Sequence, residues 1–413
     1  MPRFKNPMTI VSAILILLSL NACSLRTIKE QSTRFDKLAQ ISGQVSVTYK
    51  TDSPIVVAVL TYDDAKVDII KQTLVDGNGN YQFNLLPGEY LVGAYIDSNN
   101  NLVRDQDESA AMHNELDDIF TKIELTDNQK IILPLLEVNI DQNIGTKRKV
   151  AYSRSKIRAN IGRVISLEDP MFSKENSTMG LWRPFDFTNK IGGGLMFLQD
   201  YDKNKTPVLF VHGISGSPTE FKAVIEQLDS NKFQPWILYY PSGVPLDLVS
   251  DYLLNSLIKL HSQYGFEHLQ LISHSMGGLV TRTFLREYEK ANTNFDVSLY
   301  VTINSPLYGM DSAASGVKSS PIVIASWRDL ATGSDYIKAA HQWNVPKTLP
   351  YHLFFSYLAG EEGDGVVPLS SQLSLSLQEE ATKIYGSQAS HAGILTKPDF
   401  IQRLLKVMRS TNQ

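Results

Sequence analysis

One stretch of this sequence limits the possible folds more than any other: "LQLISHSMGGLV", residues 269–280. Apolar, β-favouring residues occupy its first half, and apolar residues at helical spacing follow the two glycines. The stretch therefore predicts a strand that turns sharply into a helix. A serine, Ser275, stands at the turn, between a histidine and a methionine.

Strand and helix patterns alternate from about residue 191 to the C-terminus. Apolar runs such as "PVLFVHG", "FQPWILYY", "HLQLIS", "VSLYVTI" and "HLFFSYLA" are separated by helical patterns such as "DYLLNSLIKLHSQYG". Alternation of this kind predicts a mostly parallel sheet with helices on both faces. After the first run, Ser217, Pro218 and Glu220 predict a helix start with a capping box. The fold class expected for 191–413 is α/β.

The preceding part of the chain has a different texture. Short alternating runs divided by turn signals over residues 39–140 predict a small antiparallel β-sandwich. Its centre, "DGNGNYQFNLLPGEYLVGAYID", resembles the carboxypeptidase-regulatory or transthyretin-like sandwich. Tyr81, Phe83, Leu85 and Tyr90 alternate into its predicted core. Residues 141–190 are expected to be a linker and lead-in. Their basic run is compatible either with a plain linker or with contact to anionic lipid headgroups.

One loop of the predicted sandwich has oxygen-bearing side chains at the spacing of a calcium loop. They occupy its first, third, fifth, ninth and twelfth positions: Asp97, Asn99, Asn101, Asp105 and Glu108. The sixth position, where glycine normally permits a sharp turn, is Leu102. A weak calcium site and a solvated acidic hairpin are the two interpretations.

Length and charge narrow the classes of function. A chain of 413 residues predicts two domains, or one large domain with an appendage. Its formal charge of −4 gives no electrostatic footprint for nucleic acid. Nucleic-acid binding is therefore not expected.

The N-terminus has the pattern of a secretion signal. Arg3 and Lys5 precede an apolar stretch, residues 8–20, that is shorter than the roughly 20 residues needed to span a bilayer. Cys23, the single cysteine of the chain, ends this segment. The arrangement resembles a bacterial lipobox, which implies a signal peptide over 1–23, a lipid on Cys23 and a tether over 24–38. Ser24 is then compatible with sorting to the outer membrane. An ordinary secretion signal with an incidental cysteine is the alternative.

The turn at Ser275 has the features of a nucleophile elbow. Small residues two positions on either side, Ser273 and Gly277, allow the tight turn that lifts a serine hydroxyl clear of the sheet. The helix that follows offers the main-chain N–H of Met276 to a developing oxyanion. A second donor is expected from Ile214, after the His212-Gly213 pair that ends an earlier strand, and His212 is expected to be structural.

Together, "FVHGISGS" and "SHSMGG" resemble the α/β-hydrolase superfamily, on its lipase and esterase side. Serine needs a histidine base and an acid that orients it, in the chain order Ser, acid, His. The resemblance implies His391 as the base and Asp364, in "EEGDGVVPLSSQ", as the acid. Their rivals are more simply explained as structural or surface residues: His341, His352, Asp335, Glu361 and Glu362.

The predicted function is hydrolysis of carboxylic esters by a lipid-anchored protein of the cell envelope, through an acyl-enzyme and without a cofactor. An insertion at about 304–350 is expected to cap the site, with ordinary helical packing as the alternative. The partners expected are an ester or lipid substrate, the membrane through the N-terminal anchor, and an envelope partner of the sandwich. An acyltransferase, thioesterase or amidase with the same triad is an alternative, as is a non-catalytic surface-binding lipoprotein.

Overall fold

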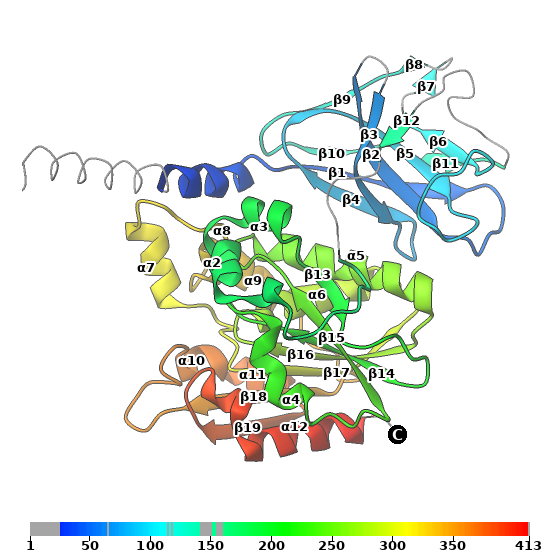
Figure 1. Ribbon diagram of the computed structural model, residues 1–413. Coiled ribbons are helices and arrows are strands. Elements are labelled where there is room, and N and C mark those ends of the chain that lie inside the picture. Colours follow the sequence, from blue (N-terminus) through cyan, green and yellow to red (C-terminus); the bar gives the residue numbers. More distant parts are fainter. Residues whose placement is uncertain are drawn as a thin grey trace, which may run out of the picture.

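The computed structural model describes most of the chain, in six segments: residues 25–63, 66–113, 115–116, 119–140, 151–153 and 160–411. Figure 1 shows a β-rich N-terminal region beside a larger unit of alternating strands and helices. Residues 1–24, with Cys23 and the predicted signal peptide, lie outside the described residues.

The larger unit is built on a seven-stranded sheet with the order β13-β15-β14-β16-β17-β18-β19. All neighbours are parallel except β13 and β15, which confirms the predicted mostly parallel sheet. The five predicted strands are β14 to β18, whereas β13 and β19 at the two edges were not predicted. The strands are β13 (Gly194–Phe197), β14 (Thr206–Val211), β15 (Phe233–Tyr239), β16 (His268–His274), β17 (Asp296–Ile303), β18 (Tyr351–Tyr357) and β19 (Lys383–Gln388).

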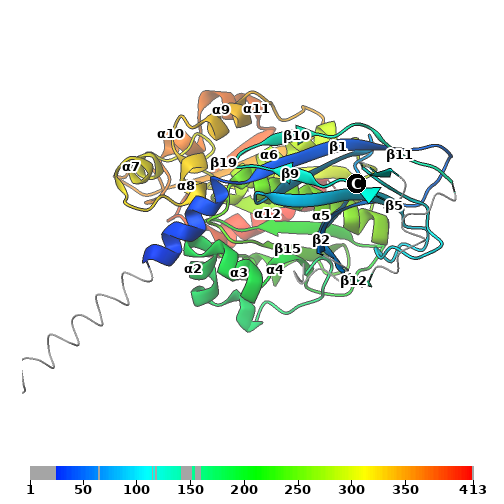
Figure 2. The ribbon, with the colours of Figure 1, turned by 90° about the horizontal axis from the view of Figure 1, so that it is seen from above.

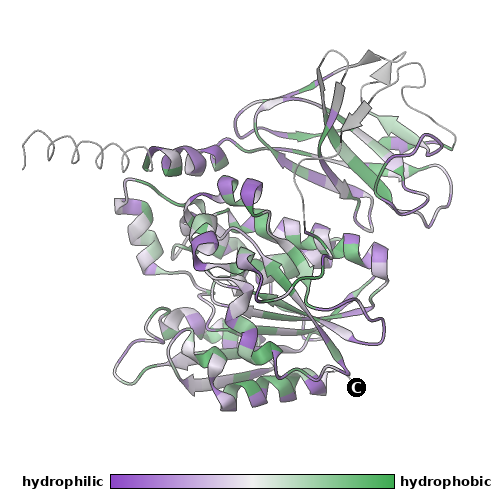
Figure 3. Cartoon of the chain, viewed as in Figure 1, coloured by the Kyte–Doolittle hydropathy of each residue, from purple (hydrophilic) through white to green (hydrophobic). Residues whose placement is uncertain are grey.

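Helices cover both faces of this sheet, and successive strand residues pack on opposite faces. Leu209 and Leu271 pack with α5 and α6 in one apolar cluster, while Phe210 and Ile272 pack with α4 and α12 in another. The helices are η1 (Pro170–Phe172), α2 (Lys174–Trp182), α3 (Pro184–Lys190), η2 (Pro218–Phe221), α4 (Lys222–Ile225), α5 (Leu246–Tyr264), α6 (Gly277–Lys290), α7 (Asp311–Ser319), α8 (Ala325–Leu330), α9 (Asp335–His341), α10 (Leu369–Gln372), α11 (Leu375–Glu380), η3 (Gly393–Thr396) and α12 (Pro398–Ser410). In Figure 3 the apolar residues concentrate on the strands and on the helix faces turned toward them.

The N-terminal region contains two main sheets. One has β1 between β4 and the strands β10 and β11, and the other has the order β12-β3-β2-β5-β6, with β9 also on β5. The strands are β1 (Ala39–Val47), β2 (Ile55–Asp63), β3 (Lys66–Leu74), β4 (Asn80–Leu85), β5 (Gly88–Ile96), β6 (Ala110–Met112), β7 (Glu115–Leu116), β8 (Ile119–Phe120), β9 (Ile123–Leu125), β10 (Lys130–Ile132), β11 (Leu136–Val138) and β12 (Ala151–Ser153). The predicted core residues Tyr81, Phe83, Leu85 and Tyr90 are buried.

The pairing in this region is not antiparallel throughout, so that part of the prediction is wrong. Strand β1 pairs in parallel with β10 and β11, and β12 pairs in parallel with β3. Parallel pairs need a crossover rather than a hairpin. The chain passes through the other sheet before β10 and β11 pair with β1. Turn signals in the sequence indicate only which consecutive strands form hairpins, so they could not predict this pairing. The division of the chain into domains stays a prediction.

The segment predicted to be a tether is helical over residues 25–35 and packs against the larger unit. The ring of Phe35 stacks on Phe185 of α3 with centroids 4.7 Å apart. Ser32 donates to the carbonyl oxygen of Val323, and Asp36 pairs with Arg328 of α8. Figure 2 shows this helix lying beside α2 and α8. These contacts could not be predicted from the sequence, because the polar composition of the segment indicates only a solvent-exposed stretch.

The predicted linker between the two parts also contributes to the larger unit. Residues 141–150 and 154–159 lie outside the described residues, but α2 and α3 pack on the sheet. Phe187 of α3 is fully buried and meets Tyr239 edge to face, with centroids 5.0 Å apart. Among the described helices, none combines the length and apolarity needed to cross a bilayer.

Candidate active site

Ser275 occupies the turn between β16 and α6. Its backbone is in the left-handed region, with φ of 53°, and its N–H donates to the carbonyl oxygen of Ile303 at 2.9 Å. A Cβ on Gly277 would lie 2.4 Å from the carbonyl oxygen of Val211, so only glycine fits at that position. The two glycines of the motif thus let the first turn of α6 approach the neighbouring strands.

The serine that replaces the usual first glycine of the elbow is accommodated without an unpaired hydroxyl. Ser273 is fully buried, and its Oγ donates to the carbonyl oxygen of Val301 at 2.9 Å. It also accepts a hydrogen bond from Thr281 on α6 at 3.1 Å. Because the Ser273 hydroxyl bonds to Val301 and Thr281 within the protein, a serine in place of the usual glycine is accommodated in the elbow.

Asp364 and His391 form a close pair. Oδ2 of Asp364 lies 2.7 Å from Nδ1 of His391, and the His391 main-chain N–H donates to the Asp364 carbonyl oxygen at 3.0 Å. The other carboxylate oxygen accepts from the N–H groups of Val366 and Val367 at 2.9 and 2.7 Å. The Asp364 side chain is fully buried, whereas that of His391 is 15% exposed. This orientation fixes Nδ1 as the protonated nitrogen and leaves Nε2 able to accept a proton.

The His391 loop meets the elbow through the residue that precedes the serine. His274 lies with its ring centroid 4.8 Å from that of His391, and its Nε2 is 3.2 Å from the His391 carbonyl oxygen. Asn304 donates to the same oxygen at 2.9 Å. The structure therefore brings together the loops that carry Ser275, Asp364 and His391.

Two main-chain N–H groups flank the serine without an internal acceptor. Met276 stands at the N-cap position of α6, and within the described residues neither its N–H nor that of Ile214 donates a hydrogen bond. A Cβ on Gly213 would lie 2.7 Å from Cβ of Ser275, which places the Ile214 loop directly beside the serine. Free N–H groups at this position can donate to an oxyanion.

His212 contacts the loop that carries Gly213 and Ile214. It is fully buried and stacks on Tyr240 with centroids 4.3 Å apart. Its Nδ1 lies 2.8 Å from the carbonyl oxygen of Gly213, and its Nε2 is 3.4 Å from the N–H of Tyr240. These partners fit a neutral ring that donates from Nδ1 and accepts at Nε2. Burial lowers the pKa of His212, with a smaller opposing effect from Glu220, which supports the predicted structural role.

The sequence did not suggest a partly buried pair between Glu220 and His274. Oε1 of Glu220 lies 2.9 Å from Nδ1 of His274 and also accepts from the N–H of Gly213 at 3.3 Å. Both ring nitrogens of His274 face oxygens that can only accept, the Glu220 carboxylate and the His391 carbonyl, so both must carry protons. Burial by itself would lower the pKa of His274, but the charge and hydrogen bond of Glu220 outweigh it, and the pKa is raised. These interactions favour a positively charged His274 beside the Asp364–His391 pair.

The sequence spacing predicts Glu220 as the acid of a capping box, and this prediction is wrong. Ser217 makes no side-chain cap; its Oγ lies 2.6 Å from the hydroxyl oxygen of Thr219 instead. The segment forms the short helix η2 before α4, which points the glutamate toward the Gly213 loop. Spacing along the chain resembled a cap, and only the packing of β16 against this loop reveals the actual partner.

The rival residues lie in other environments. His341 faces the carbonyl oxygen of Leu307 at 2.8 Å, and His352 faces the hydroxyl of Tyr385 at 3.2 Å. Burial and nearby Lys383 lower the pKa of His352 to about 4. The three acidic rivals are exposed on the surface: Asp335, Glu361 and Glu362.

The segment predicted as a cap folds into α7, α8 and α9, and both α8 and the end of α9 are bonded to the rest of the larger unit. The edge of Trp327 on α8 meets Trp182 of α2, with centroids 5.7 Å apart. Asp329 accepts from the N–H of Leu246, the first residue of α5, at 2.7 Å. At the other end Arg282 of α6 donates to the carbonyl oxygens of Ala340 and Trp343.

In the acidic loop of the N-terminal region, the carboxylates of Asp97 and Glu108 accept hydrogen bonds from main-chain N–H groups of the same loop. Asp97 accepts from the N–H groups of Asn101 and Leu102, and Glu108 accepts from those of Ser98 and Asp105. Leu102 has φ of 58°, so the chain makes the sharp turn there without glycine. Within the described residues no three His, Cys, Asp or Glu side chains gather as metal ligands. A calcium site formed by Asp97, Asn99, Asn101, Asp105 and Glu108 stays an untested prediction.

A comparison of the sequence with known protein families gives a match that includes the elbow at Ser275. Residues 245–408 match the family described as "alpha/beta hydrolase of unknown function (DUF915)". The larger unit has an α/β-hydrolase fold. We refer to it below as the hydrolase unit. No curated protein matches the sequence.

Solved structures similar to the chain include several lipases. A mature lipase of Bacillus licheniformis is 19% identical, with a TM-score of 0.40, over 50% of this chain and 94% of that one. A monoacylglycerol lipase of Paleococcus ferrophilus is 15% identical, with a TM-score of 0.37, over 50% of this chain and 96% of that one. Aspergillus fumigatus lipase B is 16% identical, with a TM-score of 0.39, over 52% of this chain and 55% of that one.

Proposed function

We propose that the protein is a serine hydrolase that cleaves carboxylic esters through an acyl-enzyme. The observation that carries the proposal is the Asp364–His391 pair, joined through His274 to a serine on a glycine-lined elbow. A nucleophile, an oriented base and free oxyanion donors are the three parts that acyl transfer requires.

In the proposed reaction Ser275 Oγ attacks the ester carbonyl carbon while His391 Nε2 takes the hydroxyl proton. The N–H groups of Ile214 and Met276 stabilise the oxyanion of the tetrahedral intermediate. Asp364 stabilises the imidazolium through Nδ1. The intermediate collapses as the C–O bond to the alcohol breaks, and His391 gives its proton to the leaving alcohol.

Water then repeats the sequence on the acyl-enzyme. His391 removes a proton from water, the resulting hydroxide attacks the acyl carbon, and the bond to Ser275 breaks. The proton held by His391 returns to Ser275, so the products are a carboxylic acid and an alcohol. None of these steps needs a cofactor.

We further propose that Cys23 carries a lipid that anchors the protein in the cell envelope, at the outer membrane. The sequence pattern at residues 8–24 supports this anchor, and the helix at 25–35 would then join it closely to the hydrolase unit. The N-terminal β region is proposed to bind an envelope partner. Incorporation of labelled palmitate into the wild type but not into Cys23→Ala tests the anchor.

Labelling with a fluorophosphonate probe tests the proposed chemistry. Wild type is expected to be labelled, Ser275→Ala to be unlabelled, and His391→Ala to be labelled far more slowly. His352→Ala is the matched control, since His352 lies outside the proposed site, and it should label like wild type. An unlabelled wild type that is folded would refute the enzyme and favour a binding protein.

Esters of graded acyl length, supplied with and without a competing alcohol, test the reaction class. Free acid as the main product in both conditions supports a hydrolase. Transfer of most of the acyl group to the alcohol would make the protein an acyltransferase with the same residues.

A further inference from the structure

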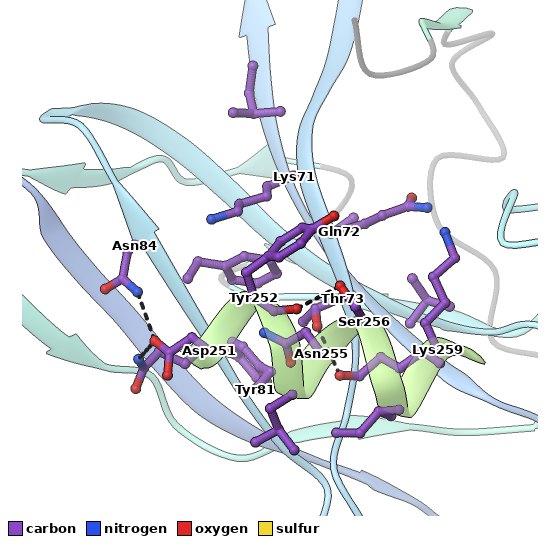
Figure 4. Close-up of a pocket in the computed structure, with 18 of the residues that line it drawn as sticks. Lys71, Gln72, Thr73, Tyr81, Asn84, Asp251, Tyr252, Asn255, Ser256 and Lys259 are labelled. Carbon is purple, nitrogen blue, oxygen red and sulfur yellow. Dashed lines mark hydrogen bonds between the residues drawn. The ribbon is translucent and has the colours of Figure 1, made fainter. Parts of the chain in front are cut away.

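A large cavity separates the N-terminal β region from the hydrolase unit. Its volume is about 1620 Å³, and it lies between strands β2 to β5 on one side and helix α5 on the other. Figure 4 shows side chains from both sides reaching into this space. Small-molecule sites usually have volumes of roughly 300–1,000 Å³, so this one has room for an extended ligand.

One wall of the cavity is an apolar sheet face. Alternate residues of β2, Val57 and Val59, pack into the core between the two sheets. Val56, Ala58 and Leu60 point to the other face and line the cavity. An antiparallel sheet that meets water on one side normally alternates apolar and polar residues. Strand β2 is instead apolar on both faces, as expected if its outer face is also covered.

The opposite wall is helix α5, which offers a mixed surface. Ile258 packs against the cluster that contains Val56, so part of the wall continues the apolar face. Nearer the start of α5, Asp251 accepts from Gln82 and Asn84 of β4 at 3.2 and 3.3 Å, which joins the two parts of the molecule. Ligand binding in the remaining space would not need to break these bonds.

Two lysines line the cavity without a hydrogen bond or close ion pair in the described part of the chain: Lys71 of β3 and Lys259 of α5. Burial lowers the pKa of both amines. For Lys71 the attraction of Asp251 opposes that effect, whereas no carboxylate compensates Lys259. Lys71 is exposed and Lys259 is half-buried. The ammonium group of Lys259, partly shielded from water and without a counter-charge, would be stabilised by a bound anion.

We propose that this cavity binds a single-chain amphiphile with an anionic head, specifically a long-chain carboxylate. The acyl chain lies between the outer face of β2 and helix α5, and the carboxylate pairs with Lys259. Lys71 is already partly neutralised by Asp251 and contributes less. This site is separate from Ser275 and does not depend on the proposed hydrolysis.

Displacement of dansyl-labelled undecanoic acid by laurate tests the proposal. The full chain with Ser275→Ala is used, because it cannot turn over esters. Laurate should displace the probe, and dodecyltrimethylammonium, which has the same chain length and the opposite charge, should displace it at least tenfold less well. Equal displacement by the cation would overturn the anionic head.

Variants locate the binding. Lys259→Ala should weaken laurate binding about tenfold, Lys259→Arg should retain it, and Ala58→Trp should abolish it by filling the space beside β2. Lys406→Ala on the exposed side of α12 is the matched control and should bind like the parent. Thermal unfolding of each variant checks its folding. Unchanged binding in folded Lys259→Ala or Ala58→Trp would refute this site, whereas fluorophosphonate labelling of Ser275 would still test the proposed function separately.

Discussion

Nε2 of His274 lies 3.2 Å from the carbonyl oxygen of His391, while Nδ1 of the same ring lies 2.9 Å from Glu220. The residue before the proposed nucleophile thus holds the loop of the proposed base. Glu220 also accepts from the N–H of Gly213, beside the proposed oxyanion donor Ile214. One partly buried ion pair therefore links two of the loops on which the proposed chemistry depends.

Glu220→Gln should lower kcat by 10- to 100-fold with little change in KM. The amide cannot balance the charge of buried His274, so the histidinium is disfavoured and its charge no longer strengthens the hydrogen bond to the His391 loop. Because Glu220 is 20% exposed, the loss of stability should be smaller than the roughly 3–5 kcal/mol typical of a fully buried pair. Steady-state kinetics and urea unfolding check both effects. Unchanged kinetics in the folded variant would show that the pair does not position the base.

The same pair predicts a pH dependence of stability. The pKa of His274 is raised in the folded protein, so its proton stabilises the fold fully below about pH 6.5, its unfolded value. This contribution is lost as the pH rises through the folded pKa. The stability difference between wild type and Glu220→Gln should therefore shrink at alkaline pH. Urea unfolding of both proteins across pH 6 to 10 measures it, and a constant difference would contradict the assignment.

Gly278→Ala should destabilise the elbow, and Ser305→Gly should rescue it. A Cβ on Gly278 would lie 2.1 Å from Oγ and 2.6 Å from Cβ of Ser305. Overpacking of this kind typically costs about 1–3 kcal/mol. Unfolding of the two single variants and the double variant gives the coupling energy. Additive effects would show that the contact with Ser305 is not what requires glycine.

Much of the hydrolase unit could be predicted because its central strands are continuous apolar runs. Strands β14 to β18 are buried on both faces, and long apolar runs divided by helices identify them. The edge strand β13 escaped prediction because its buried apolar run is only four residues long. The edge strand β19 escaped prediction because its side chains are largely accessible and its sequence has no continuous apolar run. In the N-terminal region, the parallel pairing of β1 joins residues about 90 positions apart, which local alternation does not report.

The three residues of the proposed triad could be suggested because their local motifs are distinctive, whereas Glu220 and His274 could not be paired. Asp364 stands between glycines after a strand, and Ser275 stands on an elbow. Glu220 instead resembled a helix cap, and its partner is 54 residues further along the chain. Only the packing of the Gly213 loop against β16 brings them together.

Arg282→Met should destabilise the hydrolase unit by about 3–5 kcal/mol, because it leaves the buried Glu380 carboxylate without its positively charged partner. Arg282 is fully buried and makes two hydrogen bonds to Glu380, at 2.8 and 2.9 Å. Urea unfolding measures the loss. Arg286→Met, on the same helix and partly exposed, is the matched control and should cost less than about 1 kcal/mol. Equal costs for the two variants would contradict the role given to burial.

Asp329 should make the protein more stable at mildly acidic pH than at neutral pH. Burial, and to a smaller extent the charge of Asp247, raises the pKa of Asp329 to about 7. The hydrogen bond that Asp329 accepts from the N–H of Leu246 lowers the pKa but does not outweigh burial. The folded state therefore keeps a proton that the unfolded chain releases above about pH 4, so stability falls as the pH rises from 4 to 7. Asp329→Asn still offers an acceptor to Leu246 but does not titrate. Thermal unfolding at pH 5 and pH 8 should show a smaller difference for Asp329→Asn than for wild type, and equal differences would mean that Asp329 is ionised throughout.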